Sequence, residues 1–202
     1  MVVKLGGSFA YSGTLSGWLD AIAHAAGHVV LVPGGGPFAD AVRSAQPKLR
    51  FDDAAAHHMA LLAMDQFGRA LVSLNAKLVL AASMTAIRSA LRKGQVPVWS
   101  PTKMVLAAND IPASWDVTAD SLAAWLAAQI GTQRLLLLKQ VEPPSDPVKL
   151  ADLVAGGIVD RAFADFVGTN PLEVSIAGPA LRPDAAAAFA RGNAIGARID
   201  LR

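Results

Sequence analysis

Near its start the chain carries Val2-Val3-Lys4-Leu5-Gly6-Gly7-Ser8, an apolar run that ends in a lysine and a loop of small residues. The run predicts a buried strand over residues 2–5, followed by a short loop. In a parallel α/β sheet, ligands bind at the carboxyl ends of the strands. Glycines let backbone N–H groups approach an anion closely, and a lysine there adds a positive charge. This stretch therefore predicts a phosphate-binding corner at the end of the first strand.

A second glycine loop, Pro33-Gly34-Gly35-Gly36-Pro37, follows the apolar run 28–32. Two glycine loops at strand ends indicate two anionic ligands, a donor and an acceptor. Two other interpretations stay open. The spacing Gly34-x-Gly36-x-x-Ala39 fits a loose dinucleotide-binding fingerprint with Asp52 or Asp53 as the ribose-binding acid, although both acids start a predicted helix instead of ending a strand. An ordinary tight turn before a helix is the other alternative.

The composition favours a single domain with a large buried core. Of the 202 residues, 53% are hydrophobic and 17% are charged, and the formal net charge is +2. Lysine and arginine form no dense block, which argues against nucleic acid as a partner. No apolar run is long enough to span a bilayer, and the first residues lack the pattern of a secretory signal, so we expect no membrane partner and a cytoplasmic location. The lack of cysteine excludes disulfides and thiolate chemistry.

Strand and helix patterns alternate along almost the whole chain. Strands are expected at residues 2–5, 28–32, 78–82, 96–99, 134–138, 173–176 and 197–201. Helices are expected at residues 14–26, 38–45, 52–74, 85–93, 116–130, 150–155 and 161–167. This order predicts an α/β fold, a three-layer αβα sandwich with a mostly parallel central sheet, formed by one domain over residues 1–202.

Two acids open the predicted helix 116–130. Asp116 is placed to cap it, and Asp120 lies one turn further on the same side. An acid at that place can hold the lysine of a neighbouring loop. A solvated surface acid is the competing interpretation for Asp120.

Two further cations stand at places where ligands bind. Lys139 directly follows the buried run 134–138, which repeats the arrangement of Lys4, and Arg161 follows Gly156-Gly157 before a predicted helix. A solvated side chain is the common outcome for either cation alone. Their joint placement at strand ends and helix starts favours a common anion site.

The long predicted helix over residues 52–74 carries the adjacent pair His57 and His58. Adjacent helical residues point in different directions, and no acid or histidine stands at a metal-ligand spacing on one face, so we expect no metal site. The apolar stripe at residues 60, 64, 67, 71 and 74 indicates core packing or a dimer seam.

Taken together, these motifs resemble the amino acid kinase family. They are Lys4-Leu5-Gly6-Gly7-Ser8, Gly34-Gly35-Gly36, the segment from Asp116 to Ala124, the segment from Gly156 to Arg161, and the closing Gly196-Ala197-Arg198-Ile199. Within the family, residues 58–68 and 115–121 are most similar to the branch that phosphorylates (aminomethyl)furanmethanol phosphate. That branch makes a precursor of methanofuran-type cofactors for one-carbon metabolism.

The resemblance implies transfer of the γ-phosphoryl group of ATP, with Mg²⁺, to a small anionic acceptor such as this phosphomonoester. It implies an acceptor-binding half over about residues 1–110, a nucleotide-binding half over about 111–202, and a homodimer or higher homo-oligomer. The implied catalytic residues are Lys4, Asp120 and Arg161; the nucleotide-binding residues are Gly6, Gly7, Ser8 and Lys139; the acceptor-binding residues are Gly34, Gly35, Gly36 and Asp116.

Two positions depart from the family pattern. Arg161 stands where the family has a late lysine, and Lys139-Gln140-Val141 replaces the usual Thr-Asp-Val. Alternative acceptors are isopentenyl phosphate, a nucleoside monophosphate or an amino-acid carboxylate. A non-catalytic nucleotide- or oxyanion-binding protein and a nicotinamide-dependent oxidoreductase are alternatives of other classes.

Overall fold

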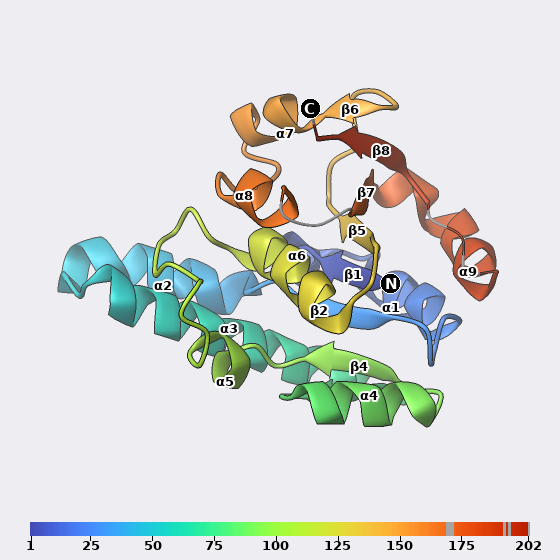
Figure 1. Cartoon of the computed structure of the whole chain (residues 1–202), viewed down its shortest axis with the longest axis horizontal. Helices are drawn as coiled ribbons and strands as arrows, with labels where there is room; N and C mark the ends of the chain where they lie inside the picture. Colours follow the sequence, from blue (N-terminus) through green and yellow to red (C-terminus); the bar gives the residue numbers. More distant parts are fainter. Residues whose placement is uncertain (169–171, 192, 194, 202) are drawn as a thin grey trace.

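A single mixed sheet forms the centre of the computed structural model, which describes residues 1–168, 172–191, 193 and 195–201 (Figure 1). Its strands are β1 (Val2–Leu5), β2 (Val30–Pro33), β3 (Leu78–Ala81), β4 (Val96–Trp99), β5 (Arg134–Leu138), β6 (Val148–Lys149), β7 (Glu173–Ala177) and β8 (Ala197–Asp200). They lie in the order β3-β4-β2-β1-β5-β7-β8-β6, and among the described pairs β7 and β8 run antiparallel while the others run parallel. The prediction of a mostly parallel sheet is confirmed.

Helices cover both faces of this sheet (Figure 1). They are α1 (Leu15–Ala23), α2 (Gly36–Leu49), α3 (Asp53–Leu74), α4 (Met84–Arg92), α5 (Thr102–Val105), α6 (Ala119–Ile130), α7 (Leu150–Ala155), α8 (Phe163–Val167) and α9 (Arg182–Ala190), with short 3-10 turns η1 (Gly7–Tyr11) and η2 (Pro179–Leu181). One apolar core contains α6 and α8, a second contains α1 and α9, and α3 contributes to both. The predicted three-layer sandwich is therefore the observed fold.

Alternation along β1 decides which way its lysine points. Val3 and Leu5 belong to the core under α1, whereas Val2 belongs to the core under α6. Because successive side chains of a strand point to opposite faces, Lys4 lies on the α6 side. In register it pairs with Val32 of β2 and Leu137 of β5, so it stands in the middle of the sheet.

Three helix starts bear on the predicted site residues. Asp52 caps α3, where its Oδ1 accepts the N–H of Ala55 at 2.8 Å. The prediction that Asp116 caps the next long helix is wrong, because α6 begins at Ala119. The helix expected from residue 161 begins only at Phe163, which leaves Arg161 in the preceding turn.

Several elements were not predicted. They are α5, α9, β6 and the two 3-10 turns, all short or rich in residues without a clear apolar period. Within the described residues, no helix combines the length and apolar character that crossing a membrane requires.

Candidate active site

A cavity of about 910 Å³ opens at the carboxyl ends of β2, β1 and β5. This volume lies near the upper end of the roughly 300–1,000 Å³ typical of ligand pockets, so it offers room for more than one small ligand. The structure brings together all the residues that the sequence nominated for the site. Those that line the cavity are Lys4, Gly6, Gly7, Ser8, Gly34, Gly35, Gly36, Asp116, Asp120, Lys139 and Arg161.

The two glycine loops contact each other through their backbones. A Cβ atom on Gly7 would lie 2.5 Å from the backbone N of Gly36, and one on Gly34 would lie 2.5 Å from the backbone N of Gly7. Gly36 also has a φ of +54°, which side chains rarely adopt. The glycines are therefore required for the packing of one loop on the other, in addition to any contact with a ligand.

Two of the backbone N–H groups in these loops already have partners. Gly6 donates to the carbonyl of Leu138 at 3.0 Å, and Gly34 donates to the carbonyl of Leu5 at 2.8 Å. These bonds fix both loops to the sheet. Binding of an anion would therefore depend on the other loop amides and on the amino-terminal turn of α2, which begins at Gly36.

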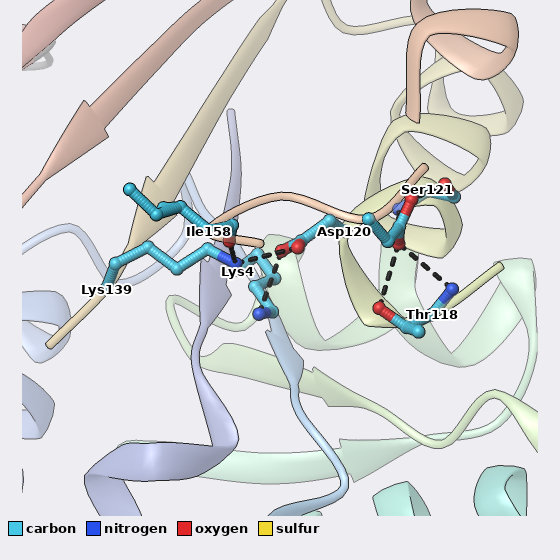
Figure 2. Close-up of polar contacts among 7 residues, drawn as sticks. Lys4, Thr118, Asp120, Ser121, Lys139 and Ile158 are labelled. Atoms are coloured by element: carbon cyan, nitrogen blue, oxygen red, sulfur yellow. Dashed lines mark hydrogen bonds and ion pairs between the residues drawn. The ribbon is translucent and has the colours of Figure 1, made fainter. Parts of the chain in front are cut away.

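Asp120 joins two lysines at the floor of the cavity (Figure 2). Its Oδ1 lies 2.8 Å from Nζ of Lys4, and its Oδ2 lies 2.7 Å from Nζ of Lys139. The three side chains are 4%, 6% and 12% exposed, respectively. A solvated surface acid, the competing interpretation for Asp120, is therefore wrong.

The charges in this cluster shift two pKa values. Burial alone would raise the pKa of Asp120, but the charges and hydrogen bonds of Lys4 and Lys139 outweigh it and lower the pKa to about 2. Burial, followed by the charge of Lys4, lowers the pKa of Lys139 to about 8 despite the opposing effect of Asp120. At neutral pH the cluster thus holds one carboxylate and two ammonium groups, with one positive charge in excess.

Asp160 fixes the start of α6 from a distant part of the chain. Its Oδ2 accepts the N–H of Thr118 at 3.0 Å, the hydroxyl of Thr118 at 2.8 Å and the N–H of Ser121 at 3.0 Å, and its Oδ1 accepts the hydroxyl of Ser121. Burial and the nearby charge of Asp120 raise the pKa of Asp160. Sequence reasoning missed this residue, because its partners lie about 40 positions away.

Backbone atoms of the loop around Arg161, and not the arginine side chain, connect this loop to the site. Nζ of Lys139 donates to the carbonyl of Ile158 (Figure 2), and the N–H of Ala162 donates to the carbonyl of Asp116 at 3.0 Å. The side chains of Arg161 and Asp116 are 82% and 58% exposed, and Nη1 of Arg161 lies 3.7 Å from Oδ1 of Asp116. Asp120 pairs with Lys4 and Lys139, whereas the ion pair of Arg161 is with Asp116.

Side chains of α2 and α3 form the outer wall of the cavity with Trp115. The indole N–H of Trp115 donates to Oε1 of Gln46 at 2.6 Å, and Nε2 of Gln46 donates to Oδ1 of Asp53 at 2.9 Å. The guanidinium carbon of Arg43 lies 4.4 Å from the centre of the indole ring. Trp115 belongs to a segment that the sequence had singled out, whereas nothing in the sequence pointed to Arg43 or Gln46.

His57 lines the same wall, half-buried, while His58 is exposed. Burial and the neighbouring charge of His58 lower the pKa of His57. Within the described ranges, no three histidine or acidic side chains gather into a group that could hold a metal ion. Asp52 and Asp53 stand at a helix start, not at a strand end, so the dinucleotide-binding interpretation lacks its acid.

Comparison with known proteins identifies a family and a relative for this chain. The model of the amino acid kinase family matches residues 1–143. One relative, the (5-(aminomethyl)furan-3-yl)methyl phosphate kinase of Methanocaldococcus jannaschii, is 24% identical over 145 residues. The match covers 70% of this chain and 66% of that protein, just under two thirds of its length.

Solved structures with the same fold include two kinases of uridine monophosphate. The uridylate kinase of Archaeoglobus fulgidus gives a TM-score of 0.72 at 18% identity, with 98% of this chain and 99% of that chain covered. The UMP kinase of Ureaplasma parvum gives a TM-score of 0.69 at 16% identity, with 98% of this chain and 97% of that chain covered. At these identities the likeness concerns the fold.

Proposed function

Because the chain belongs to the amino acid kinase family, we propose that it transfers the γ-phosphoryl group of ATP to the phosphate of a small phosphomonoester. The observation that carries this proposal is the buried cluster of Lys4, Asp120 and Lys139 beside two glycine loops in one cavity. The excess positive charge of the cluster suits a site where two anions must meet.

The chemistry needs no general base. An oxygen of the acceptor phosphate is already ionised near neutral pH and attacks the γ-phosphorus. The bond from that phosphorus to the β-bridging oxygen breaks, and its electron pair stays on ADP. The products are ADP and a diphosphate ester, so charge balances and no proton moves. The main obstacles are repulsion between the anions and the charge on the equatorial oxygens of the transferring group.

We assign the residues accordingly. Lys4 contacts the transferring phosphoryl group, and Asp120 orients Lys4 by the 2.8 Å ion pair. Gly7 and Ser8 bind the nucleotide phosphates, while Gly6 lets the loop pass close to the carbonyl of Leu138, only 3.1 Å from where a Cβ would stand. The acceptor phosphate binds at Gly34, Gly35 and Gly36, with Asp116 at the rim. We further propose that about residues 1–110 form an acceptor-binding half and about 111–202 a nucleotide-binding half, with Gly7 and Ser8 of the first half also contacting the nucleotide phosphates.

Mg²⁺ fits this site as a companion of the nucleotide. The floor of the cavity presents two lysines to one carboxylate, and both oxygens of Asp120 are engaged by them. The ion, bound by the phosphate oxygens of ATP, would neutralise part of their charge.

The relative from Methanocaldococcus jannaschii supports (5-(aminomethyl)furan-3-yl)methyl phosphate, below called the aminomethylfuran phosphate, as the acceptor. Trp115 and Arg43 line the cavity and support a flat ring beyond the glycine loop, because the hydrogen bond to Gln46 holds the indole of Trp115 in place. The structural likeness to uridylate kinases favours UMP as the second candidate. Formation of the first product would place the protein in the synthesis of methanofuran-type cofactors.

The test is ADP release from MgATP in the presence of each candidate acceptor. We expect rapid release with the aminomethylfuran phosphate and slow release with UMP, isopentenyl phosphate or an amino-acid carboxylate. Faster ADP release with UMP than with the aminomethylfuran phosphate would make the protein a nucleoside monophosphate kinase. Tight binding of ATP with no acceptor-dependent ADP would refute the enzyme and favour the nucleotide-binding alternative. Stabilisation by NAD and not by ATP would favour an oxidoreductase.

We also propose that the protein acts in the cytoplasm as a homodimer or a higher homo-oligomer. The support is the long helix α3, which leaves Met59, Leu62 and Leu74 between 40% and 58% exposed. Light scattering on the purified protein tests the oligomeric state, and a monomer at all concentrations would contradict it.

A further inference from the structure

Lys139 lines the cavity and shares Asp120 with Lys4, whereas the sequence had nominated Arg161 for catalysis. We propose that Lys139, paired with Lys4 through Asp120, is the second cation on the transferring phosphoryl group, and that Arg161 is not. This inference rests on the proposed function. Figure 2 shows the Lys4 and Lys139 side chains reaching Asp120, and Lys139 is only 12% exposed.

The sheet brings the two lysines to the same place. Leu5 pairs with Leu138 in register, so Lys139 stands just beyond the end of β5 and Lys4 just before the end of β1. Leu135 and Leu137 point into the core under α6, and Lys139 continues that alternation. Both ammonium groups therefore approach Asp120, near the amino terminus of α6, from neighbouring strands.

Lys139 keeps donor capacity for a ligand. An ammonium group has three N–H donors. One is used by Asp120 and a second by the carbonyl of Ile158. Because Lys139 lines the cavity, the third donor is available on the cavity side. These two bonds also fix the side chain before any ligand binds, which is the preorganisation that stabilises developing charge.

Arg161 lacks such fixation. Its side chain is 82% exposed, and the side chain of its ion-pair partner Asp116, which lies 3.7 Å away, is 58% exposed. Exposed pairs of this kind contribute little, and solvent screens their charge. Arg161 thus lies at the rim of the cavity, away from the lysines on its floor.

A purely structural role for Lys139 does not fit the charges. Asp120 is already matched by Lys4 at 2.8 Å, so a second ammonium adds an uncompensated charge to a buried site. Burial and Lys4 lower the pKa of Lys139 to about 8, which means that the folded protein disfavours the charged form. A bound phosphate would supply the missing negative charge.

During transfer the acceptor oxygen forms its bond to the γ-phosphorus while the bond to the β-bridging oxygen breaks, and ADP keeps that electron pair. Lys4 and Lys139 donate to the equatorial oxygens and retain their protons throughout. Loss of the proton from Lys139 would remove this contribution, so its protonation state limits the reaction at alkaline pH.

The experiment compares Lys139→Met, Lys139→Arg and Arg161→Met, with Lys93→Met, at the exposed residue that follows α4, as the matched control. ADP release from MgATP with the aminomethylfuran phosphate gives kcat and KM between about pH 6 and 9.5, and thermal unfolding gives Tm. We expect Lys139→Met to lower kcat about a hundredfold or more and Arg161→Met less than tenfold. Lys93→Met should behave as the wild type.

Two readouts separate catalysis from structural support. Lys139→Met should keep or raise Tm, because methionine removes an uncompensated buried charge, whereas a structural ion pair would make Tm fall. The kcat/KM of the wild type, which reports the ligand-free enzyme, should decline above about pH 8, and Lys139→Arg should shift that decline to higher pH because guanidinium keeps its proton.

Three outcomes would overturn the inference. A kcat of Lys139→Met within threefold of the wild type would do so and leave the proposed function intact. An equal or larger loss in Arg161→Met would restore Arg161 as the second cation. If the wild type releases no acceptor-dependent ADP with the aminomethylfuran phosphate, UMP or isopentenyl phosphate, the proposed function fails and the inference fails with it.

Discussion

Replacement of Asp120 by asparagine removes the one negative charge between two buried lysines. The variant keeps the shape of the side chain, so the change concerns charge. Asparagine also places an amide N–H₂ group where one carboxylate oxygen stood. This group cannot accept a hydrogen bond from the ammonium group that faces it. We therefore expect effects on both stability and turnover, with stability changing in a characteristic way with pH.

The size of the stability effect follows from the pKa. Lys4 and Lys139 overcome the effect of burial and lower the pKa of Asp120 from 3.8 to about 2. A shift of that size corresponds to about 2 kcal/mol of stability at neutral pH. Because the folded-state pKa is the lower one, this contribution is present above about pH 4 and is lost as the pH falls through 2. Removal of one partner of a buried ion pair costs up to about 5 kcal/mol, but the variant can relieve part of this cost by releasing the proton of Lys139.

Two assays check this reasoning. Urea unfolding of Asp120→Asn should show a loss of about 2 kcal/mol at pH 7 that shrinks below pH 4, and exposed Asp165→Asn serves as control. Release of ADP should slow about a hundredfold, with a smaller change in ATP binding because Asp120 acts through the lysines. A variant that turns over within threefold of the wild type and unfolds alike at every pH would refute the account of Asp120.

Other substitutions probe the remaining parts of the site. Lys4→Ala should lower kcat about a hundredfold or more while circular dichroism stays unchanged, and near-normal turnover would remove Lys4 from the mechanism. Gly7→Ala forces a Cβ to 2.5 Å from the backbone N of Gly36 and should reduce stability by about 1–3 kcal/mol, whereas Gly13→Ala, with nothing within 4 Å, should be neutral; equal Tm values would contradict the loop contact. Asp160→Asn weakens the hydrogen bonds at the start of α6 and should lower both Tm and kcat, and unchanged kinetics would limit Asp160 to a role in stability.

The sequence predicted most of the sheet because buried parallel strands have a simple pattern. Residues 2–5, 96–99 and 134–138 are short apolar runs bounded by polar or small residues, and each is a strand with the predicted bounds. The cap at Asp52 was also predictable, since the bond to Ala55 is local. The start of α6 was not, because its first N–H groups bond to Asp160, and such a distant partner leaves no mark in the local sequence.

The same distinction applies to the candidate site. The sequence nominated the residues that line the cavity because each follows a strand or opens a helix, and those ends converge in this fold. Their pairing could not be predicted, because it depends on side-chain lengths and directions in space. Lys139, which follows β5, reaches Asp120. Arg161, which stands where the family pattern has its late lysine, is mostly exposed to solvent.

The most direct test is a crystal structure with ADP, Mg²⁺, aluminium fluoride and the aminomethylfuran phosphate bound together. The account predicts that the planar fluoride group, which stands in for the transferring phosphoryl, lies about 2.7–3.1 Å from Nζ of both Lys4 and Lys139. A fluoride group bound elsewhere, with neither lysine in contact, would contradict it.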